Sequence, residues 1–263
     1  MNCNKFCTVL CCNQRYLKCA EKWSHIKIKV KGFYFNVAFL FIRTFGSKVV
    51  TLHVSDYDRI DEKHGIQKLS EGESMKKSEM INRIEENPII AAIRDENDLE
   101  EAVNSQITTV FLIHGDIFNI KGMVDRLKSA DKSVFIHFDF LEGLGRDNRA
   151  IDYISEVIKP EGIISTKNGC IKYAMEKGLF SIQRVFLIDS QSYDMAVKTA
   201  QSVQPHMLEI LPGIMPEILK RITKQVSMPV IAGGFIESKE DIIGTLSAGA
   251  LAVSTGRKEL WVL

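Results

Sequence analysis

Between residues 89 and 261 the chain repeats one unit eight times: a short apolar run, a polar or glycine-containing turn, and an amphipathic stretch. The apolar runs are too short for helices, are rich in β-branched residues and lack polar alternation, as is typical of parallel strands buried on both faces. They span residues 89–93, 109–114, 134–140, 162–166, 180–186, 207–211, 229–234 and 250–255. This repetition predicts an α/β fold, a single (β/α)8 barrel of TIM type.

Apolar residues at spacings of three and four indicate helices between the runs. The clearest span residues 98–105, 148–159, 192–204 and 215–226. In such a barrel the ligand site lies at the carboxyl ends of the strands and in the loops that follow them. The fold therefore predicts where the chemistry lies, but not which chemistry it is.

The chain has two parts of unlike composition. Residues 1–74 carry 12 Lys and Arg against 7 Asp and Glu, whereas residues 75–263 carry 22 against 26. The first 70 residues show no sustained period, and their apolar stretch 32–45 is too short to span a bilayer. We therefore predict a mildly acidic barrel over residues 75–263, with no membrane segment, preceded by an extension foreign to the fold.

Cysteine usage separates the same two parts. The barrel holds only Cys170, which needs no disulfide and fits a reducing cytoplasm. The other five lack the two separated ligand pairs of a structural zinc site, so no metal is predicted. They are Cys3, Cys7, Cys11, Cys12 and Cys19.

Three hypotheses account for residues 1–74. The first is that translation begins at Met75, because residues 71–73 can be encoded by a purine-rich run resembling a bacterial ribosome-binding site. The others are a disordered or lineage-specific extension and a small cysteine-bearing binding module. An intact mass of native protein that includes residues 1–74 would exclude the first.

The last two units carry the most specific signal. Gly233 and Gly234 end one strand, and Ser254, Thr255 and Gly256 end the next. Glycines let backbone N–H groups approach an anion, hydroxyls add donors, and loops after strands seven and eight form the usual phosphate site of this fold. The alternative is that the glycines only make tight turns. A phosphorylated ligand is the favoured inference.

Charged residues near other strand ends would face the same mouth. Arg184 and Glu209 stand within apolar strands, where a charge is costly unless it is paired or faces a wet site. They are predicted to contact the ligand or, alternatively, to form a structural ion pair. Asp139 closes the third strand and Lys167 follows the fourth, and both are further ligand candidates.

His137 precedes Asp139 by two residues in the predicted third strand, so alternation would put both side chains on one side. It is a candidate general base or a satisfied core histidine, and His114 is equally ambiguous. No Cys-His or Ser-His-Asp spacing singles out a nucleophile. No catalytic residue is therefore predicted.

Nine short motifs occur in order along the barrel: PIIAAIR (88–94), VFL (110–112), LEGLGRD (141–147), GIISTK (162–167), IQRVF (182–186), DS (189–190), EILPG (209–213), IAGG (231–234) and AVST (252–255). Together they resemble the bacterial glycerol uptake operon antiterminator regulatory family over about residues 80–263. Nothing before Met75 takes part, in agreement with a start at that residue.

The resemblance implies a cytoplasmic, non-enzymatic regulator that binds glycerol 3-phosphate as its effector and needs no cofactor. Such a regulator acts on the leader mRNA of glycerol-utilisation genes and prevents premature termination of transcription. On this reading Glu209 and Asp139 accept hydrogen bonds from the glycerol hydroxyls, while Arg184 and Lys167 balance the dianion or orient those carboxylates. The phosphate is expected at Gly233, Gly234, Ser254, Thr255 and Gly256.

RNA binding is expected to rely on local cations, because phosphate contacts supply much of the affinity and the barrel as a whole is acidic. The candidates near the mouth are Arg146, Arg149, Arg257 and Lys258. Each could instead be a solvated surface charge.

Two other functions stay open. One is an enzyme acting on glycerol phosphate, such as a prenylglyceryl phosphate synthase, with Asp95 and Asp116 as Mg²⁺ ligands; each is more naturally a helix N-terminal residue. The other is a ligand-binding barrel that acts through a protein partner. Assembly into a homo-oligomer is equally open.

Overall fold

The computed structural model describes residues 26–30, 33–37 and 77–263, and the chain divides into two compact units between Gly72 and Glu73. In the first unit, β1 (Ile26–Val30) pairs antiparallel with β2 (Phe33–Val37). The expectation of no period in the first 70 residues was wrong for this segment, because its Ile-Lys-Ile-Lys-Val run alternates as a strand does. The three hypotheses on residues 1–74 stay predictions, since most of these residues lie outside the described ranges.

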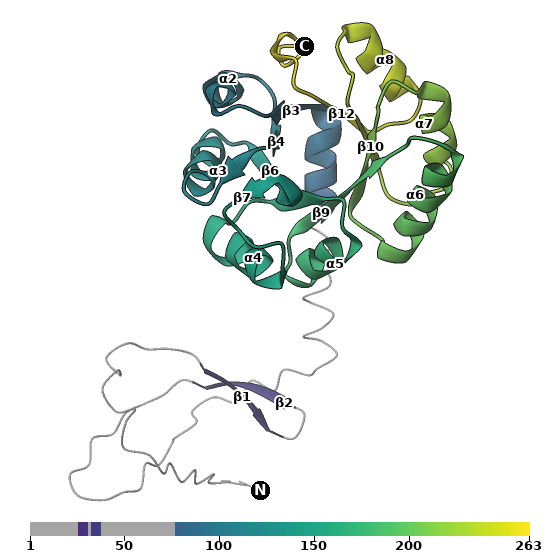
Figure 1. The fold of residues 1–263 in the computed structure, drawn as a ribbon. Helices are drawn as coiled ribbons and strands as arrows, with labels where there is room; N and C mark the ends of the chain where they lie inside the picture. Colours follow the sequence, from purple (N-terminus) through teal and green to yellow (C-terminus); the bar gives the residue numbers. More distant parts are fainter. Residues whose placement is uncertain (1–25, 31–32, 38–76) are drawn as a thin grey trace, which may run out of the picture. The chain divides into compact units, whose positions relative to one another are not determined.

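The second unit is a closed barrel of eight parallel strands, which confirms the predicted fold (Figure 1). Neighbouring strands in the ring follow one another in the chain, and β12 closes the ring by pairing with β3. The barrel strands are β3 (Ile89–Ile93), β4 (Thr109–Leu112), β6 (Ser133–His137), β8 (Gly162–Ser165), β9 (Phe180–Phe186), β10 (Met207–Leu211), β11 (Val230–Gly233) and β12 (Ala252–Thr255).

Helices surround the ring of strands (Figure 1). Each turns an apolar face toward the barrel, as the spacing of three and four predicts. None of the helices in the part of the chain that the structure describes is long and apolar enough to cross a membrane. The outer helices are α2 (Leu99–Asn104), α3 (Ile120–Ser129), α4 (Asn148–Tyr153), α5 (Asn168–Glu176), α6 (Ser190–Val203), α7 (Pro216–Ile222) and α8 (Lys239–Ser247). The π-helix η3 (Ile154–Ile158) continues α4, and η1 (Glu96–Asp98) and η4 (Lys258–Leu260) are short 3₁₀ helices.

The third barrel strand is shorter than the sequence predicts. It ends at His137, and Phe138–Phe140 form a 3₁₀ turn, η2. Asp139 therefore lies in a turn beyond the strand. The expectation that strand alternation aligns it with His137 was wrong.

The loops after β4 and β6 are tied to each other. The strand pair β5 (Gly115–Asp116) and β7 (Leu141–Glu142) forms a separate parallel two-stranded sheet, and the Ile117 N–H donates to the Glu142 carbonyl at 3.0 Å. The predicted second run, residues 109–114, accordingly ends as a barrel strand at Leu112. This small sheet fixes one side of the barrel mouth.

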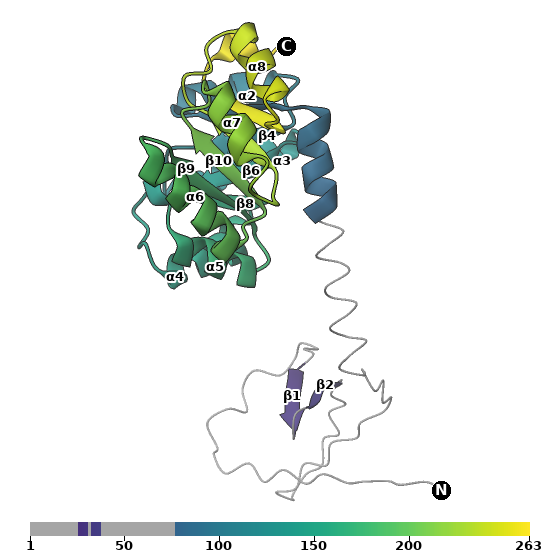
Figure 2. The same cartoon turned by 90° about the vertical axis from the view of Figure 1, so that its right-hand side faces the viewer.

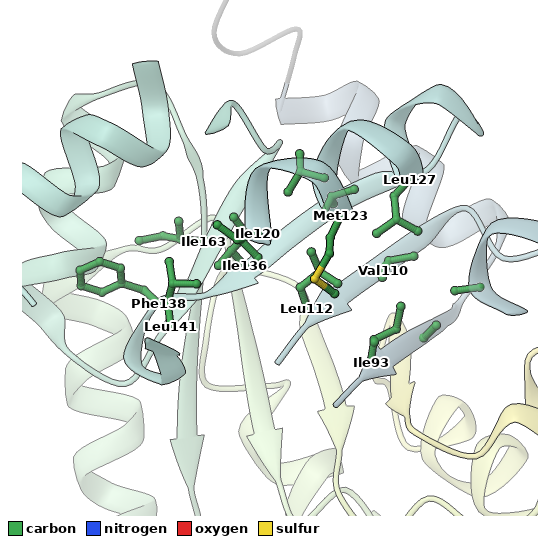
Figure 3. Close-up of a cluster of buried hydrophobic side chains, with 14 of the residues drawn as sticks. Ile93, Val110, Leu112, Ile120, Met123, Leu127, Ile136, Phe138, Leu141 and Ile163 are labelled. Atoms are coloured by element: carbon green, nitrogen blue, oxygen red, sulfur yellow. The ribbon is translucent and has the colours of Figure 1, made fainter. Parts of the chain in front are cut away.

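A continuous apolar layer lies between the strands and the outer helices (Figure 3). Val110 and Leu112 alternate outward from β4 and pack with Met123 and Leu127 of α3. All four side chains are buried. This layer holds the helices on the barrel.

A second apolar cluster fills the barrel interior. Phe111 of β4 and Phe135 of β6 meet there edge to face, with ring centroids 5.7 Å apart. The helix over residues 77–86 contributes Ile84, which is fully buried in the same cluster. Because this helix immediately precedes β3, it closes the amino-terminal end of the barrel, as Figures 1 and 2 show.

Candidate functional site

A buried polar network joins side chains of three barrel strands, the neighbours β9 and β10 together with β12 on the far side of β11. Arg184 of β9 and Glu209 of β10 are register partners, and the Arg184 Nε donates to Glu209 Oε2 at 2.6 Å. Ser254 of β12 donates its hydroxyl to Glu209 Oε1 at 2.8 Å. The side chains of Arg184 and Glu209 are 7% and 0% exposed. The ion pair that sequence reasoning offered as an alternative is therefore present, within the barrel.

This ion pair leaves part of the guanidinium available. Breaking a buried pair by removing one partner costs about 3–5 kcal/mol, so the pair fixes both side chains firmly. Only Nε of Arg184 has a hydrogen-bond partner among the described residues, and a guanidinium has further N–H donors on its two terminal nitrogens. Arg184 can therefore bind an anion while Glu209 holds it in place.

Gly233 makes room for this network. A Cβ at Gly233 would lie 2.4 Å from Ser254 Oγ and 2.9 Å from Glu209 Oε1. The hydrogen bond between those two side chains therefore requires glycine at this position. Sequence reasoning located the glycine but could not give this reason, because the two side chains that exclude a Cβ come from other strands.

The turn after β11 has an unusual backbone. Gly234 has a φ of 78° and Phe235 a φ of 61°, both in the left-handed region that favours glycine. A bulky residue there stores strain, which is often found at functional sites. The Gly234 carbonyl accepts a hydrogen bond from the Gly213 N–H at 3.1 Å, so the loops after β10 and β11 are joined. Gly234 thus makes a tight turn, and whether its loop also binds phosphate stays a prediction.

Asp139 organises the loop after β8. Its carboxylate accepts from the Ser165 hydroxyl at 2.8 Å and from the Thr166 N–H and hydroxyl at 2.7 and 2.9 Å. Burial disfavours ionisation, but these hydrogen bonds outweigh it and lower the pKa of Asp139. They also account for the turn that ends β6. Lys167, the next residue of this loop, is exposed at the mouth.

Thr255 lies on the opposite face of β12 from Ser254. Its hydroxyl donates to the Ile236 carbonyl at 2.8 Å and accepts from the Arg257 N–H at 3.1 Å. In this structure the Thr255 side chain therefore holds the neighbouring loop. Gly256 is exposed at the end of the same strand. The phosphate roles of Thr255 and Gly256 stay predictions.

His137 is 1% exposed at the end of β6. Its ring stacks on Phe140, with centroids 4.4 Å apart, and neither ring nitrogen has a hydrogen-bond partner among the described residues. Burial, and then the positive charge of Arg184, lower the pKa of His137 to about 3. The imidazole is therefore neutral near pH 7, and it is not the satisfied core histidine that was one interpretation of the sequence.

Two of the predicted RNA-binding cations are already paired with carboxylates. The Arg257 guanidinium lies 2.9 Å from Glu237. The Lys258 ammonium lies 2.5 Å from Asp98 and 3.0 Å from Glu101, and these two hydrogen bonds raise its pKa to about 12. Both are therefore less available to a nucleic acid than their sequence positions indicate.

The other two predicted cations are exposed, and exposed aromatic side chains lie in the loops after β4 and β6. Arg146 is exposed, and Arg149, 92% exposed, has only a 3.3 Å contact with Asp152 among the residues that the structure describes. Phe118 and Phe140 lie in the two loops that the small β5–β7 sheet joins to this segment. Arg146, Arg149, Phe118 and Phe140 are called the Arg–Phe surface below.

Sequence reasoning missed the large apolar side chains around the mouth. Phe118 is 94% exposed and Ile188 is 87% exposed. The sequence feature that could have identified them is a bulky apolar residue just after a strand end that does not belong to the apolar spacing of the following helix. The exposed set is Phe118, Phe140, Phe186, Ile188, Ile214 and Phe235.

The two carboxylates considered as Mg²⁺ ligands act at helix starts. Asp95 accepts from the Asn97 N–H at 2.9 Å and precedes η1. Asp116 accepts from the Phe118 and Asn119 N–H groups at 2.7 and 3.0 Å. Asp95 therefore fits the alternative interpretation as a helix N-terminal residue, whereas Asp116 holds the turn before Asn119, the N-cap of α3.

A cavity of about 970 Å³ lies at the amino-terminal end of the barrel rather than at the mouth. Ion pairs fill part of its rim, including Arg83 with Asp131 and Lys128 with Glu161. Ligand sites of this fold lie at the opposite end. The mouth is therefore the stronger candidate site.

Comparison with known proteins agrees with the motif resemblance. A curated relative, the uncharacterized protein YgcP of Escherichia coli strain K12, is 36% identical over 184 residues, or 70% of this chain and 96% of that protein. The crystal structure of a glycerol uptake operon antiterminator regulatory protein from Listeria monocytogenes is 38% identical with a TM-score of 0.64, covering 66% of this chain and 94% of that one.

A second crystal structure, of a glycerol uptake operon antiterminator-related protein from Thermotoga maritima, is 30% identical with a TM-score of 0.60 and covers 66% of this chain and 98% of that one. The model of the glycerol-3-phosphate responsive antiterminator family matches residues 89–261. This range comprises all the strands of the barrel and most of the chain. The protein therefore belongs to the glycerol-3-phosphate responsive antiterminator family.

Proposed function

We propose that this protein binds glycerol 3-phosphate at the mouth of its barrel and, in that state, binds leader mRNA of glycerol-utilisation genes in the cytoplasm and prevents premature termination. The observation that carries the proposal is the buried network of Arg184, Glu209 and Ser254 beneath the glycine turn at Gly233 and Gly234. A small ligand with one dianionic end and one hydroxyl-bearing end suits such a site.

The phosphate end would bind where donors gather. Arg184 offers the terminal nitrogens of its guanidinium, and the turns at Gly233–Gly234 and Gly256 offer backbone N–H groups without interfering side chains. Lys167 adds an exposed cation from the loop after β8. Glu209 orients Arg184, and its negative charge disfavours a phosphate placed directly on it. The hydroxyl end would therefore lie toward the centre of the mouth.

RNA would bind the Arg–Phe surface. Single-stranded RNA is held by stacking of bases on aromatic rings together with cationic contacts to the backbone. Phe118 is almost fully exposed, Arg146 lies in the loop after β7, and Arg149 lies in the first turn of α4. Arg257 and Lys258 contribute less, because their charges are matched by Glu237, Asp98 and Glu101. Effector binding can promote RNA binding only if the RNA-competent state binds the effector more tightly.

A gel-shift titration of the full chain with the glycerol-operon leader RNA of the same genome, with and without glycerol 3-phosphate, tests the proposal. A shift strengthened by the effector supports it. Calorimetric binding of glycerol 3-phosphate without any RNA shift would remove the RNA half and favour a protein partner. Turnover of a prenyl diphosphate with glycerol phosphate would instead identify the protein as an enzyme.

Two variants locate the RNA surface. Phe118→Ala is expected to weaken RNA binding by about tenfold, as loss of one stacked base would. Arg146→Ala is expected to weaken binding equally across RNA sequences and to reduce the slope of log affinity against log salt by about 1. Lys258→Met is the matched control, because this cation is already paired with Asp98 and Glu101. A larger effect at Lys258 than at Arg146 would move the RNA surface away from these loops.

A further inference from the structure

We propose that His137 is a ligand-binding residue that reads the hydroxyl end of a small phosphorylated polyol bound at the mouth. This inference rests on the proposed binding of such an effector and assigns a contact on the side of the barrel opposite the phosphate turns. The structure supports it through the position of His137, its lack of partners and the chemistry of its neighbours.

The topology places His137 across the mouth from the glycine turn. Ser133, Phe135 and His137 alternate to one side of β6, and Phe135 belongs to the cluster that fills the barrel interior. His137 therefore faces the interior one layer nearer the mouth than Phe135. In the ring of eight strands, β6 stands four positions from β11, which ends at Gly233. A ligand whose phosphate lies at that turn extends its other end toward β6.

The ring nitrogens of His137 are free to contact such a ligand. Both are buried, and neither finds a partner in the part of the chain that the structure describes. Buried polar groups are nearly always hydrogen-bonded, so an unpaired one at a mouth signals a ligand. The only contact described for the ring itself is the stack on Phe140. This stack fixes the plane of the imidazole without using its nitrogens.

Neighbouring charges determine which end of the ligand His137 can read. Burial and the positive charge of Arg184 lower the pKa of His137, whereas the negative charge of Asp139 raises it, and the imidazole is neutral as a result. A neutral imidazole carries one donor and one acceptor, which match a hydroxyl better than a dianionic phosphate. Both carboxylate oxygens of Glu209 already accept hydrogen bonds. Glu209 has no donor to offer to a hydroxyl oxygen, and His137 supplies one.

Calorimetry with two ligands tests this role in the full chain. Glycerol 3-phosphate and n-propyl phosphate share the phosphate and the three-carbon chain, but only the first has hydroxyls. His137→Phe keeps a planar ring against Phe140 and removes both polar atoms. The substitution is expected to weaken the affinity for glycerol 3-phosphate about tenfold, as loss of one hydrogen bond would. The affinity for n-propyl phosphate is expected to stay unchanged.

The controls separate this role from a structural one. His137→Gln keeps a donor and an acceptor and is expected to recover part of the affinity for glycerol 3-phosphate. His114→Phe, at an exposed histidine after β4, is expected to leave both ligands unchanged. Equal weakening of both ligands by His137→Phe, or unchanged binding of glycerol 3-phosphate, would overturn the role of His137. Failure of the unmodified protein to bind glycerol 3-phosphate would instead overturn the proposed function.

Discussion

Acid should destabilise this protein through His137. Burial and the charge of Arg184 lower the folded-state pKa of His137 to about 3, from an ordinary value of 6.5. Below pH 6.5 the unfolded chain therefore binds a proton that the folded protein does not, so stability falls as the pH falls from 6.5 toward 3. The loss is about 1.4 kcal/mol per pH unit, or about 2 kcal/mol at pH 5. His206, whose pKa burial and then Lys77 lower to about 4, adds a change of the same sign.

Urea unfolding followed by circular dichroism at pH 7, 6 and 5 measures this effect. His137→Phe cannot titrate, so its free energy of unfolding should fall less between pH 7 and pH 5 than that of the unmodified chain, by about 2 kcal/mol. Between pH 8 and pH 7 the difference between the two proteins should stay constant, which serves as the control. Equal losses in both proteins between pH 7 and pH 5 would refute the argument that His137 stays neutral when folded.

Three further substitutions test the barrel and its mouth. Glu209→Ala leaves Arg184 buried without its carboxylate and should lower the free energy of unfolding by about 3–5 kcal/mol; a loss under about 1 kcal/mol in urea unfolding would show that the pair is dispensable. Gly233→Ala puts a Cβ against Ser254 Oγ and should cost about 1–3 kcal/mol and weaken glycerol 3-phosphate binding, so unchanged calorimetric affinity would contradict its role. Ile84→Ala opens a cavity beneath the barrel and should cost about 2–5 kcal/mol, whereas an unchanged thermal midpoint would exclude the helix over residues 77–86 from the core.

The sequence was sufficient for the barrel because its physical cause is local. A strand buried on both faces must be apolar throughout, and the helix that follows it must carry an apolar stripe. Each unit of the repeat is therefore recognisable from consecutive residues. The same logic drew attention to Arg184 and Glu209, since a charge inside an apolar strand needs a partner or a wet site. The two residues are partners in one buried ion pair, which was one of the two alternatives, and their contact with a ligand stays a prediction.

The partners of those side chains could be known only from the tertiary structure, because they come from other strands. The sequence marks Arg146 and Lys258 alike as surface cations, yet Lys258 meets Asp98 and Glu101 from the other end of the barrel sequence. Asp139 lies beyond the end of its strand and accepts hydrogen bonds from Ser165 and Thr166. No local sequence pattern predicts these contacts.

The sequence by itself therefore determined the fold and the family, because each is encoded in local periodicity or in ordered motifs. The tertiary structure decided which polar groups are already satisfied and which are free to bind. Glu209 holds Arg184 and Ser254, whereas His137 is left buried without a partner. The physical reason is that closing the ring brings distant residues within hydrogen-bond distance, and only that closure determines which donors and acceptors meet.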